Sequence, residues 1–99
     1  MIRGTTPTLE FELPFETALL AEAWVTFAQS GKNILDKNLA DCVCNGSTLS
    51  VRLTQEETLA LNCGCVTEIQ LRVKTVEGDA LASDPVKVYT DRILKDGVI

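Results

Sequence analysis

The chain has 99 residues, 45% of them hydrophobic, a length and composition typical of one globular domain with its own core. Fourteen Asp and Glu residues outnumber nine Lys and Arg residues, which gives a net charge of −5. The basic residues are scattered singly, so the chain lacks the basic stripe that neutralises nucleic-acid phosphates or binds anionic membranes. We therefore expect a single domain over residues 1–99 that binds neither nucleic acid nor membrane.

The N-terminal stretch Met1–Thr8 is mostly polar and shows no apolar signal-peptide region, and no apolar run is long enough to span a membrane. We accordingly expect a cytoplasmic protein with reduced thiols. We expect the end segments 1–7 and 91–99 to be flexible.

Apolar and polar residues alternate in five segments, the pattern of antiparallel strands with one buried and one wet face. In chain order these segments are 9–13, 23–28, 49–53, 69–74 and 86–89. With turn residues between them, they predict an all-β antiparallel sandwich of six to seven strands. The residues expected to form its core are Leu9, Phe11, Val25, Phe27, Leu49, Val51, Leu53, Ile69, Leu71, Val73 and Val88.

Residues 15–27 allow two interpretations. Helix formers are frequent over 15–22, and Phe15, Leu19, Ala23 and Phe27 have i, i+4 spacing, which suits a helix. Residues 24–27 are strongly β-prone, which favours a loop followed by a strand. We favour the strand and keep the partial helix as the alternative.

A short helical turn is predicted near residues 54–61. Thr54 and Glu57 have the spacing of a capping box, in which each side chain bonds the other residue's backbone amide. Asn62 and Gly64 can end the turn in a left-handed conformation.

The four cysteines form two Cys-x-Cys pairs, Cys42 with Cys44 and Cys63 with Cys65. Four thiolates can hold zinc or Cu(I), so a metal-binding or redox module is the alternative function. Structural zinc sites, however, usually place two to four residues between paired cysteines. We therefore expect free thiols, with no metal and no cofactor.

Catalytic motifs are missing from the sequence. Histidine is absent, which removes the commonest general base and every Ser-His or Cys-His pair. No Gly-rich phosphate loop occurs. We expect a protein that is not an enzyme and that has no catalytic residues.

Trp24 is the single tryptophan of the chain. If Val25 points inward, Trp24 and Thr26 point outward, where a tryptophan is a candidate interface residue. The alternative is that Trp24 plugs the core. Apolar residues near the two ends complete the interface residues that we expect: Ile2, Ile93, Leu94, Val98 and Ile99.

Three blocks of the sequence are similar to small prophage-encoded proteins of Gram-positive bacteria. They are Arg3–Thr6 before Phe11-x-Leu13, the block Val51–Thr58, and the strand Ile69–Val73 followed by Gly78. In outline, residues 3–88 resemble the N-terminal immunoglobulin-like domain of phage baseplate upper proteins. The resemblance implies a virion tail or baseplate component, or an assembly factor, that acts through protein contacts. It implies other phage subunits or further copies of the chain as partners, first in the host cytoplasm and then in the virion.

Overall fold

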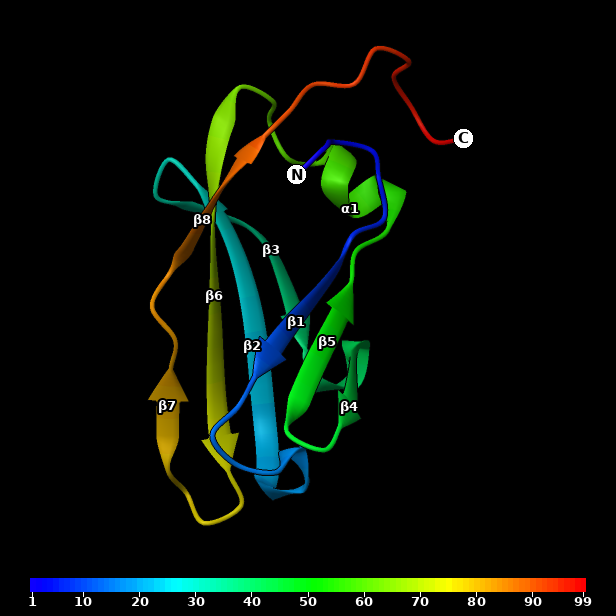
Figure 1. The fold of residues 1–99 in the computed structure, drawn as a ribbon. Coiled ribbons are helices and arrows are strands. Elements are labelled where there is room, and N and C mark those ends of the chain that lie inside the picture. The colour runs from blue at the N-terminus through cyan, green and yellow to red at the C-terminus, as the bar shows by residue number, and fades with distance from the viewer.

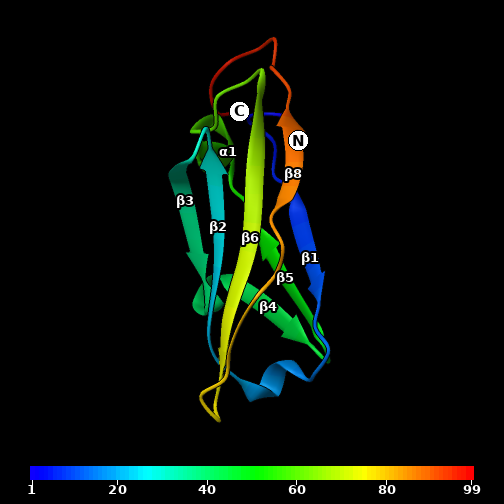
Figure 2. The ribbon, with the colours of Figure 1, turned by 90° about the vertical axis from the view of Figure 1, so that its left-hand side faces the viewer.

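The computed structural model describes all 99 residues and contains two antiparallel sheets that face each other (Figures 1 and 2). The three-stranded sheet has the order β1 (Thr8–Glu12), β5 (Thr48–Arg52) and β4 (Cys42–Asn45). The five-stranded sheet has the order β3 (Lys32–Asn38), β2 (Leu20–Gln29), β6 (Cys65–Thr75) and β7 (Ala80–Ala82), with β8 (Val86–Thr90) also paired to β6. The expected all-β sandwich is confirmed, with eight strands in place of six or seven.

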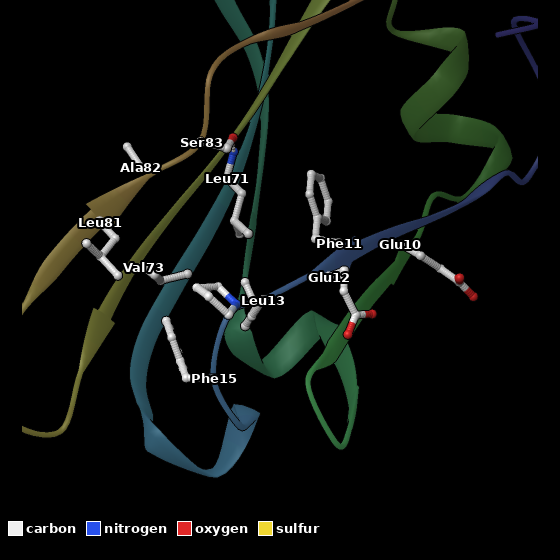
Figure 3. A pocket seen from close by; sticks show the side chains of 11 residues that line it. Glu10, Phe11, Glu12, Leu13, Phe15, Leu71, Val73, Leu81, Ala82 and Ser83 are labelled. Atoms are coloured by element: carbon white, nitrogen blue, oxygen red, sulfur yellow. Dashed lines mark hydrogen bonds between the residues drawn. The ribbon is translucent and has the colours of Figure 1, made fainter.

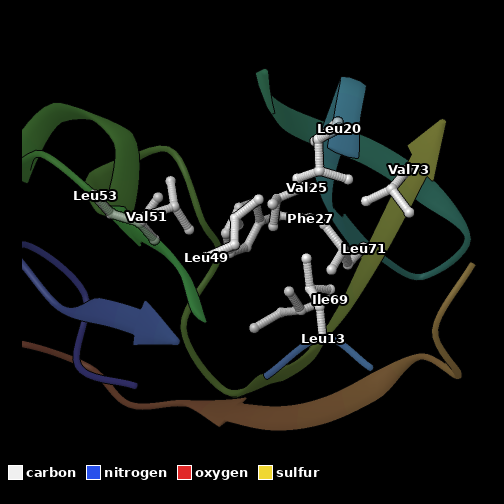
Figure 4. Close-up of a cluster of buried hydrophobic side chains, with 11 residues drawn as sticks. Leu13, Leu20, Val25, Phe27, Leu49, Val51, Leu53, Ile69, Leu71 and Val73 are labelled. Atoms are coloured by element: carbon white, nitrogen blue, oxygen red, sulfur yellow. The ribbon is translucent and has the colours of Figure 1, made fainter. Parts of the chain in front are cut away.

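The two sheets bury one face each against the other (Figure 4). Ala23, Val25 and Phe27 of β2 are fully buried, as are Leu49 and Val51 of β5. Because side chains alternate between the faces of a strand, the polar residues between them point to solvent. Eight of the eleven expected core residues are buried, and Leu9, Phe11 and Val88 are partly buried against the same cluster.

Residues 15–27 form a loop and a strand, and the helical alternative is wrong apart from one 3-10 turn. That turn covers Thr17–Leu19, and β2 then runs for ten residues. β2 pairs with β3 on one side and with β6 on the other, so its backbone groups are satisfied within the sheet. This pairing on both edges outweighs the local preference of residues 15–22 for helix.

The predicted helical turn is α1 (Gln55–Leu59), which connects β5 to β6. Thr54 Oγ1 accepts a hydrogen bond from Glu57 N (3.2 Å), and Thr54 N donates to Glu57 Oε1 (2.8 Å). The expected capping box is thus present. A second short 3-10 turn at Leu39–Asp41 leads into β4.

The sandwich is closed at one end and open along one side. Met1–Arg3 pairs with the chain beyond β8: Arg3 N donates to Asp91 O, and Asp91 N donates to Met1 O. From Thr8 onward the chain forms β1, which pairs with β5 of the three-stranded sheet. β1 and β7 are consequently edge strands of different sheets, with a gap between them.

None of the helices combines the length and the apolar character needed to cross a membrane.

Candidate interaction surfaces

Trp24 lies on the outer face of the five-stranded sheet, as the alternation predicted. Its side chain is 39% exposed, whereas Ala23, Val25 and Phe27 on the same strand are fully buried. The indole Nε1 donates to Glu22 Oε1 at 2.8 Å, so the polar edge of the ring is satisfied at the surface. Trp24 therefore does not plug the core.

The register of the sheet brings Arg72 beside Trp24. Trp24 on β2 and Arg72 on β6 are directly opposite each other, and both line two shallow hollows of about 190 and 460 Å³. Thr26 lines the larger hollow and donates to Asp36 Oδ1 at 2.6 Å. The outer face therefore presents an aromatic ring next to a guanidinium, with a polar surround.

The five predicted residues near the ends of the chain lie on the terminal segments and not on the Trp24 face. Ile2 forms a bridge with Asp91. Ile93 packs against Gly4, so closely that a Cβ atom added to Gly4 would lie 3.1 Å from Ile93 Cδ1. Leu94 and Ile99 are about nine-tenths exposed, and Val98 lines a small hollow beside β5 and α1.

Both terminal segments, which we expected to be flexible, are bonded to the body of the domain. Arg3 Nε donates to the carbonyls of Leu59 (3.1 Å) and Leu61 (2.9 Å), and Arg3 Nη1 contacts Asp96 Oδ1 at 2.9 Å. Gln55 Nε2 donates to Ile99 O and its Oε1 accepts from Ile99 N. Arg3 and Ile99 thus tie the two terminal segments to α1 and the residues that follow it.

The two cysteine pairs lie in different parts of the fold. Cys42 and Cys44 belong to β4, whereas Cys63 lies in the turn before β6 and Cys65 begins that strand, toward the end of the molecule where the terminal segments meet (Figure 1). All four are free, and no group of three or more His, Cys, Asp or Glu side chains is arranged to hold a metal ion. Burial is the main cause of a raised pKa for the Cys42 thiol, with smaller effects of nearby Cys44 and Asp41. The arrangement does not bring four thiolates to one site.

One apolar hollow of the molecule was not among the sequence predictions. It is an apolar groove of about 480 Å³ between β1 and β7 (Figure 3). Phe11, Leu13, Phe15 and Leu81 line its sides, and Leu71 with other core residues forms its floor. The sequence contained one indication of this groove: Phe15 continues the alternating apolar residues of β1 beyond the end of the strand. Only the pairing of the strands shows what lies opposite.

Acidic side chains lie along the β1 side of the groove. Glu10 and Glu12 line it from β1, and Figure 3 shows their carboxylates directed away from Leu71 and Val73 on the floor. Ser47 Oγ and Thr48 Oγ1 donate to the Glu12 carboxylate, and these hydrogen bonds, Ser47 first, lower the pKa of Glu12. The groove is therefore apolar inside and negative at its edge.

No protein-family model, curated protein or solved structure matches the chain.

Proposed function

We propose that the chain is a non-enzymatic interaction protein that binds partner proteins through the outer face of its five-stranded sheet. The observation that carries this proposal is the exposed Trp24 beside Arg72. Tryptophan and arginine are the residues most enriched at the energetic centres of protein interfaces. Here the sheet holds both on a rigid surface, so little conformational entropy is lost on binding.

The sequence resemblance over residues 3–88 supports a more specific role. We propose that the protein is a tail or baseplate subunit of a phage, or a factor in its assembly. Its partners are then other structural subunits or further copies of itself, met first in the host cytoplasm and afterwards in the virion. A β-sandwich suits this role because its two outer faces and its strand edges can each take a neighbour.

The variant Trp24→Ser tests the contact surface. We expect it to lower the free energy of unfolding by about 1 kcal/mol or less, far below the ~3–5 kcal/mol of a buried tryptophan. Self-association, followed by sedimentation velocity, and binding to co-expressed products of the neighbouring genes should both weaken. Val43→Ser serves as the matched control, because Val43 is an exposed apolar residue on β4 of the other sheet.

Two results would contradict this proposal. One is a Trp24→Ser chain that does not fold. The other is a folded variant that associates as the unchanged protein does. A gene located away from head, tail and lysis genes would separately remove the phage role while leaving the Trp24 surface to be judged on binding.

A further inference from the structure

The groove between β1 and β7 offers unpaired main-chain groups as well as an apolar floor. Leu13 N donates to Ser47 O (2.8 Å) and Leu53 N donates to Pro7 O (3.0 Å) across the β1–β5 pair. In an antiparallel pair the hydrogen-bonded residues alternate, so Leu9 and Phe11 also direct their main-chain groups to β5. The N–H and C=O groups of Glu10 and Glu12 then face the free edge, where no strand pairs with β1.

The apolar surface extends beyond the groove itself. A second hollow of about 330 Å³ shares Phe15 and Leu81 with it and continues to Leu19 and Val76. Leu81, Leu19 and Val76 are all about half exposed or more. The groove volume of about 480 Å³ lies within the ~300–1,000 Å³ range of binding pockets, so it has room for several apolar side chains.

The charges around the groove define what would sit there. Its two hollows are lined by four carboxylates, those of Glu10, Glu12, Glu77 and Asp79, and by no lysine or arginine. A strand paired with β1 would place alternate side chains beside Phe11, over the apolar floor. The residues between them would lie beside Glu10 and Glu12, where opposite charge is stabilising and like charge is not.

We propose that the groove binds an extended strand of a partner protein in which apolar residues alternate with lysine or arginine. Main-chain hydrogen bonds to the free edge of β1 supply the pairing, and the apolar floor with its acidic edge supplies the sequence preference. This inference goes beyond the function proposed above, because it assigns a second surface that does not include Trp24 or Arg72.

The chain's own C-terminal segment does not occupy this groove. Residues 92–99 lie beside α1, where Ile99 bonds Gln55, near the end of the molecule opposite the loop that carries Phe15 (Figure 1). Of the two strands that border the groove, β1 carries glutamates but no lysine, and β7 carries no charge, so neither has the lysine residues with which exposed edges often avoid pairing.

Short, blocked peptides in which Lys and Val alternate provide the probe, with binding followed by fluorescence anisotropy of a labelled peptide. We expect the Lys–Val peptide to bind at least about tenfold more tightly than the same peptide with Glu in place of Lys. Two further peptides should bind as weakly as the Glu peptide. One has the same composition with Lys and Val in separate blocks, and the other is the Lys–Val peptide N-methylated along one edge. Amide exchange of Glu10 and Glu12 should slow when the Lys–Val peptide is bound.

Variants of the protein locate the site. Leu81→Glu places a charge in the groove at a position that is half exposed, so the domain should fold, and it should lower affinity about tenfold or more. Val43→Glu makes the same change on β4, the opposite edge of the three-stranded sheet from β1, and should leave affinity unchanged. Trp24→Ser should also leave it unchanged, which separates this site from the Trp24 surface.

Equal binding of the Lys and Glu peptides, tight binding of the N-methylated peptide, or an unaffected Leu81→Glu variant would overturn the proposal. So would tighter binding of a peptide of residues 92–99, which would assign the groove to a second copy of the chain.

Discussion

Gln29 is a polar residue at a position that the alternation of β2 assigns to the core, and it is only 3% exposed. Its amide satisfies groups from two other parts of the chain. Nε2 donates to Asn62 O (2.9 Å) and to Thr67 Oγ1 (3.1 Å), while Oε1 accepts from Asn62 N (2.8 Å). Thr67 in turn shares a hydrogen bond of 2.7 Å with Thr90. Gln29 thereby fastens the loop after α1 to the sheet.

We predict that Gln29→Leu destabilises the domain by about 1–3 kcal/mol. The substitution keeps a similar side-chain volume but removes the partner of the part-buried N–H and C=O of Asn62, and losing such hydrogen bonds costs about that much. Urea denaturation measures the effect. Gln70→Leu is the control, because Gln70 is exposed on β6 and its amide makes one hydrogen bond, to Ser83 O. If the two variants were equally stable, the Gln29 bonds would contribute nothing to folding.

At the scale of elements, α1 is held to the five-stranded sheet by an ion pair. Lys37 Nζ of β3 donates to both carboxylate oxygens of Glu57, at 2.7 and 2.9 Å, and both side chains are largely buried. Burial of Glu57 tends to raise its pKa, but the bonds from Lys37 and Thr54 outweigh this, so the pKa of Glu57 is lowered. One carboxylate thus caps the helix and ties it to β3.

This pair makes stability depend on pH. Because the folded-state pKa of Glu57 lies below its unfolded value of about 4.3, the stabilisation is complete above that value and disappears as the pH falls through the folded pKa. We therefore predict that Glu57→Gln is less stable than the unchanged chain at pH 7, and that the difference shrinks toward pH 3. Chemical denaturation across this range measures it.

Glu56→Gln is the matched control for the pH series. Glu56 lies in the same helical turn with its side chain exposed, so the substitution removes the same charge without breaking the ion pair. Its cost should stay within about ±0.5 kcal/mol and change little with pH. A Glu57→Gln deficit that is constant from pH 7 to pH 3 would show that the ion pair does not act in this way.

At the scale of the whole molecule, the two sheets share one core, and neither has a second apolar layer. Leu71 of β6 is 5% exposed and contacts this core from the five-stranded sheet, while Leu49 and Val51 contribute from the other. The terminal segments close one end of the sandwich through Arg3 and Asp91. We therefore expect the two sheets to unfold together.

Leu71→Ala tests this cooperation. We predict a loss of about 2–5 kcal/mol, the cost of a buried Leu→Ala cavity, with a single transition seen both by far-UV circular dichroism and by Trp24 fluorescence. Leu94→Ala is the control, since Leu94 is 89% exposed and should change stability by no more than about ±0.5 kcal/mol. A loss below about 1 kcal/mol for Leu71→Ala, or two separate transitions, would contradict a single shared core.

The sequence by itself determined which face the alternating strands bury and where the helix begins. Alternation identified the buried residues of β2, β5 and β6 and the outward Trp24, because side chains of a strand alternate whatever its partners are. The Thr54–Glu57 spacing located α1, because capping depends only on neighbouring residues. Very short strands such as β7, with three residues, carried too little pattern to be recognised.

Only the tertiary structure decided which elements meet. Alternation does not encode the register between strands, so nothing local placed Arg72 opposite Trp24 or Asn62 against Gln29. The same holds for the cysteines: the pairing of β4 with β5 puts Cys42 and Cys44 in one sheet, and the pairing of β6 with β8 puts Cys65 in the other. The groove lies between β1 and β7 because β1 pairs with β5 in the three-stranded sheet. This long-range pairing packs Phe11 and Leu9 against the common core.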